Sequence, residues 1–91
     1  MPLTEKVSFT TMLQQEDKLQ IPRLIRGRFK MENDQTLKIG INFLELHTGW
    51  QFFHTKMRKD GRITIPKRTL MLVGNKENLA GSAVQAIIEP A

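Results

Sequence analysis

The sequence predicts a small, mostly β domain with two short helices (a small α+β fold): a six-stranded barrel with pseudo-twofold symmetry, made of two strand–strand–short helix–strand repeats. Three observations favour this class. Short segments alternate between apolar and polar residues, a proline follows such a segment in each half, and the two halves align at a constant offset. We expect one domain over residues 1–91, with internal repeats at approximately 5–44 and 49–91.

The alignment depends on two prolines. Placing Pro22 on Pro66 sets an offset of 66 − 22 = 44 residues, and Phe9 then falls on Phe53. Residue class, turn position and proline match together, so we interpret the pattern as an internal duplication. The alternative is that two β-hairpins share a common pattern.

Each half begins with a strand that has one apolar side. That side consists of Val7, Phe9, Thr11 and Leu13 in the first half and Phe53, Thr55 and Met57 in the second. The opposite side of the second-half strand is predicted to be exposed, and it carries Phe52, His54 and Lys56. The turns "QQED" and "RKDG" follow, and second strands then begin around Leu19 and Ile63.

The prolines mark a change from strand to helix. Proline lacks an N–H, so it ends a ladder, and its fixed φ suits the start of a helix. In the second half the helix is predicted to stop at Gly74, a C′ glycine. In the first half Gly27 weakens the corresponding helix by up to about 1 kcal/mol.

A third strand completes each half. Its apolar side is formed by Leu37, Ile39, Ile41 and Phe43 in the first half and by Val84, Ala86 and Ile88 in the second. Neither half can bury its apolar face alone. Two halves that close face to face would make a barrel without free edges, with Trp50 plugging one end.

Composition restricts the function classes. The chain has a formal charge of +5, 40% hydrophobic residues, no cysteine, and no apolar run long enough for a membrane span. We therefore expect a soluble, cytoplasmic protein without membrane contact. His47 and His54 are too few and too isolated for a metal site, no catalytic set or Gly-rich phosphate loop is evident, and we expect neither an enzyme nor a cofactor.

The segment "DGRITIPK" resembles the hairpin of the AbrB/SpoVT/MazE group of swapped-hairpin DNA-binding proteins. The matching residues are Gly61, Arg62, Ile63, Thr64, Ile65, Pro66 and Lys67. The first copy, "DKLQIPR", has Asp17 in place of the glycine. Members of that family usually carry one such unit per chain, and two chains exchange hairpins to bind DNA.

The tandem arrangement is more similar to the cradle-loop barrels, particularly the RIFT type, in which two such halves form one barrel within a chain. We therefore favour a monomeric RIFT-like barrel, with a swapped-hairpin homodimer as the alternative.

The resemblance and the charge distribution together predict a small DNA-binding protein, a transcription regulator of the AbrB-like kind, with double-stranded DNA as its partner. Basic residues cluster near both prolines, where the corners could merge into one positive surface. The predicted contact residues are Lys56, Arg58, Lys59, Arg62, Lys67 and Arg68, helped by Lys18, Arg23 and Arg26. The first turn is acidic where the second is basic, so either binding is asymmetric or only the second copy binds.

Two other functions remain open. A barrel of this kind could serve as a protein- or ligand-interaction module that does not bind DNA. An antitoxin of the MazE kind ranks lower, because such proteins add a long C-terminal tail and this sequence ends at Ala91, directly after the last predicted strand.

Overall fold

The chain consists of two halves, each with the element order strand, strand, helix, strand. The computed structural model describes residues 5–31, 35–46, 49–73 and 79–91. Their elements are β1 (Val7–Met12), the 3₁₀ turn η1 (Gln15–Asp17), β2 (Lys18–Gln20), α1 (Arg23–Arg28), β3 (Thr36–Phe43), β4 (Gln51–Lys56), β5 (Arg62–Thr64), α2 (Lys67–Val73) and β6 (Ala83–Pro90). The mostly β class is thus confirmed. No helix among the described residues is long and apolar enough to cross a membrane.

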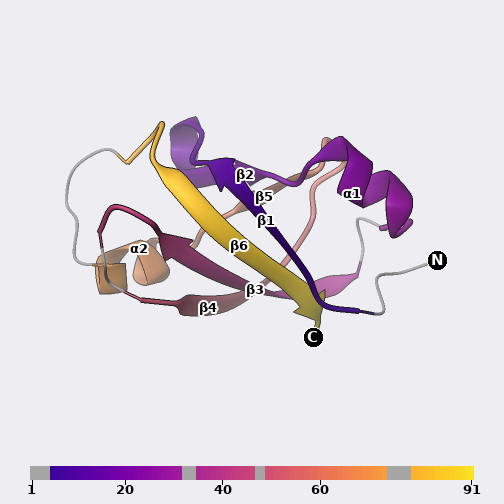
Figure 1. The fold of residues 1–91 in the computed structure, drawn as a ribbon. Helices are drawn as coiled ribbons and strands as arrows, with labels where there is room; N and C mark the ends of the chain where they lie inside the picture. Colours follow the sequence, from indigo (N-terminus) through magenta and orange to yellow (C-terminus); the bar gives the residue numbers. More distant parts are fainter. Residues whose placement is uncertain (1–4, 32–34, 47–48, 74–78) are drawn as a thin grey trace.

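The strands form two antiparallel sheets (Figure 1). The larger sheet has the order β1-β6-β3-β4, and β2 pairs with β5 in a two-stranded ribbon. The predicted closed six-stranded barrel is wrong in this respect. β2 and β5 have three residues each and pair with one another, and a tight turn separates each from the long strand before it. Within the described residues, no ladder of backbone hydrogen bonds therefore joins β1 to β2 or β4 to β5.

Backbone hydrogen bonds recur at a spacing of 44 residues. Ile21 N donates to Gly61 O over 2.9 Å, and Ile65 N donates to Asp17 O over 2.8 Å, so the same bond is made in both directions across the ribbon. Likewise, Arg26 N donates to Pro22 O at 3.0 Å, and the equivalent Leu70 N donates to Pro66 O at 3.2 Å. The larger sheet has the same twofold relation: exchanging β1 with β4 and β6 with β3 gives the same strand order, read from the opposite edge.

The pairing of residues across the larger sheet shows a second spacing between equivalent residues of the two halves. Phe9 lies opposite Ala86, and Phe53 lies opposite Ile39. If Phe9 and Phe53 are equivalent, Ile39 and Ala86 are equivalent too, at a spacing of 86 − 39 = 47 residues. The second half therefore has three more residues than the first between its proline and its last strand.

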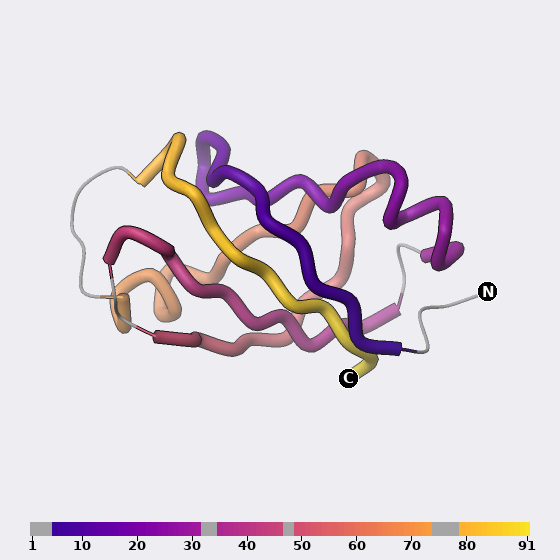
Figure 2. The backbone as a smooth tube through the Cα atoms, in the orientation of Figure 1, coloured from indigo at the N-terminus to yellow at the C-terminus, as the bar shows by residue number. Residues whose placement is uncertain are grey.

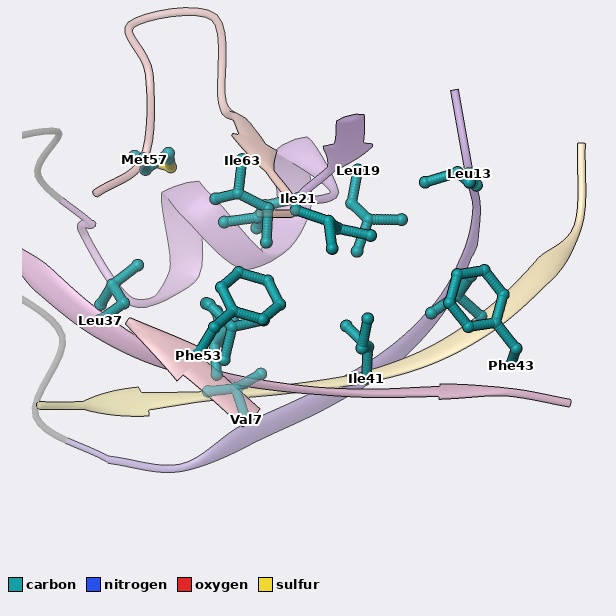
Figure 3. Packing of buried hydrophobic residues seen from close by; sticks show 14 of the residues in the cluster. Val7, Leu13, Leu19, Ile21, Leu37, Ile41, Phe43, Phe53, Met57 and Ile63 are labelled. Carbon is teal, nitrogen blue, oxygen red and sulfur yellow. The ribbon is translucent and has the colours of Figure 1, made fainter. Parts of the chain in front are cut away.

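The core lies between the larger sheet and the ribbon (Figure 3). Leu19 and Ile63, which face each other across the ribbon, are fully buried and point toward the larger sheet. The alternation read from the sequence is confirmed at the third strands, whose seven inward residues are all buried: Leu37, Ile39, Ile41, Phe43, Val84, Ala86 and Ile88. Phe52, His54 and Lys56 are exposed, as expected.

The two helices begin directly after the prolines, as predicted, and lie at opposite ends of the molecule (Figure 1). α2 buries Thr69 and Val73, whereas α1 has no buried residue and leaves Leu24 87% exposed. The predicted C′ glycine of α2, Gly74, lies outside the described residues. α2 in turn leaves Met71 and Leu72 exposed, so both helices present apolar side chains to solvent.

The turns before β2 and β5 share a left-handed backbone. Asp17 has φ of 59° and Gly61, its equivalent in the alignment, has φ of 81°. A Cβ on Gly61 would also overlap the Arg26 guanidinium. Glycine is therefore required at one turn, and the other turn tolerates aspartate at a conformational cost.

Substitutions at these two positions should change stability in opposite directions. Gly61→Ala is expected to lower the free energy of unfolding by about 1–2 kcal/mol, because the left-handed backbone penalises a Cβ. Asp17→Gly is expected to raise it by up to about 1 kcal/mol, because glycine adopts this φ without that penalty. Urea unfolding followed by circular dichroism measures both changes. A loss of stability in Asp17→Gly would contradict the argument.

Candidate functional site

Each helix starts beside the turn of the opposite half. The antiparallel ribbon places Ile21, which precedes α1, next to Gly61, and it places Ile65, which precedes α2, next to Asp17. Gln20 Nε2 also donates to Asp60 O over 3.0 Å. The turn before β5 consequently lies beside the start of α1, where the salmon and purple segments approach each other (Figure 2).

This crossing gathers cations at one end of the molecule. We call this the basic end; it consists of Arg23, Arg26, Arg28, Arg58, Lys59 and Arg62, with Asp60 as the acid among them. Arg23, Arg28, Arg58 and Lys59 are exposed, whereas Arg26 and Arg62 are half-buried. A shallow, open hollow along α1 is lined by Arg23, Leu24, Arg26, Gly27 and Arg28. The basic end can therefore present several cations to one anionic partner.

The other proline corner has mixed charge. We call it the mixed end; it consists of Glu16, Asp17, Lys18, Lys67 and Arg68. Lys18 Nζ lies 3.3 Å from Glu16 Oε2, and the Lys18 side chain is only 19% exposed. The two corners thus do not merge into one positive surface. Of the predicted contact residues, five lie at the basic end, three at the mixed end, and Lys56 on the outer face of β4.

Arg26 holds α1 against the turn. Its Nε donates to Ile21 O over 3.1 Å, and its guanidinium covers Gly61. The remaining donors of the guanidinium can still meet an anion, because arginine carries five N–H groups. Arg26 therefore has a structural role that its sequence position does not reveal.

Arg62 is tied to Asp60. Its Nε donates to Asp60 Oδ2 over 2.9 Å, and Nη2 lies 2.8 Å from the same oxygen. The backbone N–H of Arg62 donates to Asp60 Oδ1 over 3.1 Å, and this bond is the main cause that lowers the pKa of Asp60. The side-chain hydrogen bond and the positive charge of Arg62 lower that pKa further. Because Asp60 offsets the charge of Arg62, the other arginines and Lys59 carry most of the field at this end.

Acid should loosen this turn. Because the pKa of Asp60 is below its ordinary value of 3.8, the contribution of the carboxylate to stability is present above about pH 4 and is lost as the pH falls through the folded-state pKa. An NMR titration should place the Asp60 midpoint below 3.8 in the wild type. Arg62→Ala should raise that midpoint only part of the way, because the backbone N–H of residue 62 remains. A wild-type midpoint at or above the ordinary value would contradict this account.

Sequence reasoning missed two features. Arg28 joins the basic end, with its Cζ 5.5 Å from the centre of the Phe29 ring. Trp50 does not plug a barrel end; it stacks on Phe52 outside the core, with 6.4 Å between ring centroids. Side chains on a strand alternate between its two faces, so Trp50, two residues before the outward-facing Phe52, could have been predicted to lie on the outer face.

No protein-family model, curated protein or solved structure matches this chain.

Proposed function

We propose that this protein binds double-stranded DNA through its basic end and acts as a transcription regulator of the AbrB-like kind, in a RIFT-like relative of the swapped-hairpin fold. Two features support the proposal: the resemblance of the "GRITIPK" hairpin to that family, and the gathering of six cations around one acid. The single observation that carries it is the crossing of the ribbon, which brings the basic turn of one half to the basic helix of the other.

The exposed cations of the basic end are available for phosphates. Within the part of the chain that the structure describes, Arg23, Arg28, Arg58 and Lys59 have no carboxylate at ion-pairing distance. Guanidinium groups bind phosphate oxygens bidentately, and such charge-assisted bonds are about twice as strong as neutral ones. Contacts of this type position a protein on the duplex without reading its sequence.

The charge difference between the two ends favours asymmetric binding. Glu16 and Asp17 would lie against phosphates if the mixed end bound DNA in the same way, and that contact is repulsive. Each chain would then offer one strong DNA-binding surface rather than two equal ones. Of the two alternatives left by the sequence, the proposal adopts the asymmetric one.

A salt titration tests the proposal. Fluorescence anisotropy with a labelled duplex of about 20 base pairs is measured from about 50 to 200 mM salt, and log K should fall linearly with log salt at about −0.9 per phosphate neutralised. With four to six cations in contact, the slope should be about −4 to −5. Absence of binding at the lowest salt overturns the proposal. If partners captured from a lysate then survive nuclease treatment, the interaction-module alternative replaces it.

A further inference from the structure

The outer face of the larger sheet carries a row of side chains along β4 that the proposed function does not use. Phe53 points inward and is buried, so Phe52, His54 and Lys56 point outward. Trp50 precedes them at the same alternation. Outward side chains on a strand recur about every 6.7 Å, close to the distance between successive nucleotides in an extended single strand. We call this row, Trp50, Phe52, His54 and Lys56, the outer stripe.

The aromatic end of the stripe is a flat platform made of the exposed Phe52 and the half-buried Trp50. The rings of Trp50 and Phe52 are inclined by only 22°, and Phe52 is 54% exposed. Phe52 lies opposite Gly40, and a Cβ on Gly40 would come within 2.6 Å of the ring, so the ring lies across the bare backbone of β3. Covering a sheet glycine explains one aromatic residue. The half-buried Trp50 ring also approaches this position, with its Cε3 3.4 Å from such a Cβ, so the two rings together cover Gly40 and form one aromatic surface that is exposed mainly at Phe52.

Cations flank the platform. Lys38 Nζ lies 5.2 Å from the centre of the Phe52 ring and 3.8 Å from Glu89 Oε1. Lys56 ends the stripe at the last residue of β4. The other outward positions of the sheet include the polar Ser8, Thr10, Asn42 and Gln85, together with Ile87 opposite Gly40 and Glu89 opposite Lys38. An apolar protein surface would leave the polar groups unpaired, whereas nucleobase edges can hydrogen-bond with them.

We propose that the outer stripe binds single-stranded nucleic acid, with bases stacking on Phe52 and Trp50 and phosphates meeting Lys38 and Lys56. Aromatic side chains beside a positively charged track are the features by which sequence-tolerant single-strand binding operates. The site lies on the larger sheet, so it goes beyond the duplex surface proposed above and shares no residue with the basic end.

Intrinsic fluorescence gives a direct readout, because Trp50 is the only tryptophan and the chain has no tyrosine. Titration with a thymidine oligonucleotide of about 12 residues should quench the emission as bases stack on the platform. An abasic oligonucleotide of the same length carries the phosphates without bases, so it should bind about tenfold or more weakly. Equal binding of the two, or no quenching at saturation, would overturn the inference.

Two variants and one control separate stacking from folding. Phe52→Ala should weaken oligonucleotide binding about tenfold or more. Phe52→Leu, which keeps an apolar cover over Gly40, should lose most of the same affinity. Met12→Ala removes a comparably exposed side chain (59%) from β1, at the opposite edge of the sheet, and should bind as the wild type does. A loss in Met12→Ala equal to that in Phe52→Ala, or no loss in either Phe52 variant, would refute the stacking site.

Duplex binding distinguishes this inference from the proposed function. Phe52→Ala should leave the affinity for duplex DNA and its salt slope unchanged, since the platform does not touch that surface. Wild-type binding to the duplex without quenching by the single strand would remove only the present inference. Quenching without duplex binding would remove only the proposed function.

Discussion

Replacement of Ile63 by alanine is expected to lower the free energy of unfolding by about 2–5 kcal/mol, a large share of the roughly 5–15 kcal/mol typical of a domain. Ile63 is fully buried at the middle of β5, and it faces Leu19 of the other half. The change removes apolar contacts and leaves a cavity between the ribbon and the larger sheet, and the surrounding strands can close it only partly. Chemical denaturation measured by circular dichroism gives the value.

The adjacent residue supplies a matched control. Thr64 lies next to Ile63 on the same strand but is exposed, so Thr64→Ala should change the free energy of unfolding by less than about 0.5 kcal/mol. A double-mutant cycle with Leu19→Ala should also show coupling of about 0.5–3 kcal/mol, because the two side chains share one part of the core. Equal effects of Ile63→Ala and Thr64→Ala would mean that the ribbon does not pack on the larger sheet.

The double substitution Arg58→Ala/Lys59→Ala should weaken binding to duplex DNA about tenfold or more and make the salt slope shallower by about 2 units. Both side chains are exposed at the basic end, so their removal eliminates phosphate contacts without disturbing the core. The loss should be similar for unrelated duplex sequences, because phosphate contacts carry no base information. Anisotropy titrations across salt measure both quantities.

The mixed end provides the control for charge alone. Lys67→Ala/Arg68→Ala removes the same number of positive charges from two exposed positions at the start of α2. Because Glu16 and Asp17 lie beside that corner, this variant should keep most of the affinity and of the salt slope. Equal losses in both double variants would show that binding follows net charge, and the assignment of the duplex surface to the basic end would be wrong.

Much of the fold follows from local patterns. Alternation identified the inward residues of the third strands, since a strand with one buried face repeats every second residue. The prolines located the helix starts, because a residue without an N–H ends a ladder and its φ suits a helix. Closure into a barrel was not predictable in this way. It depends on hydrogen bonds between β1 and β2 and between β4 and β5, and the short ribbon strands pair with each other instead.

The candidate site was predicted as a set of residues but not as a surface. Sequence reasoning found cations near both prolines, yet it could not tell which of them share an end of the molecule. Arg26 looks like its neighbours in the sequence, whereas in the structure it bridges α1 and the turn at Gly61. The contact with Gly61 joins residues 61 − 26 = 35 positions apart, and no local pattern encodes it.

Local patterns in the amino-acid sequence specify which side of each strand is apolar, where the chain turns from strand to helix, and which residues are cationic. These properties depend on side-chain chemistry and on backbone preferences over a few residues. The three-dimensional fold, in contrast, establishes that the basic turn meets the basic helix while the acidic turn meets α2. The reason is the antiparallel pairing of β2 with β5, which places the end of each ribbon strand beside the beginning of the other.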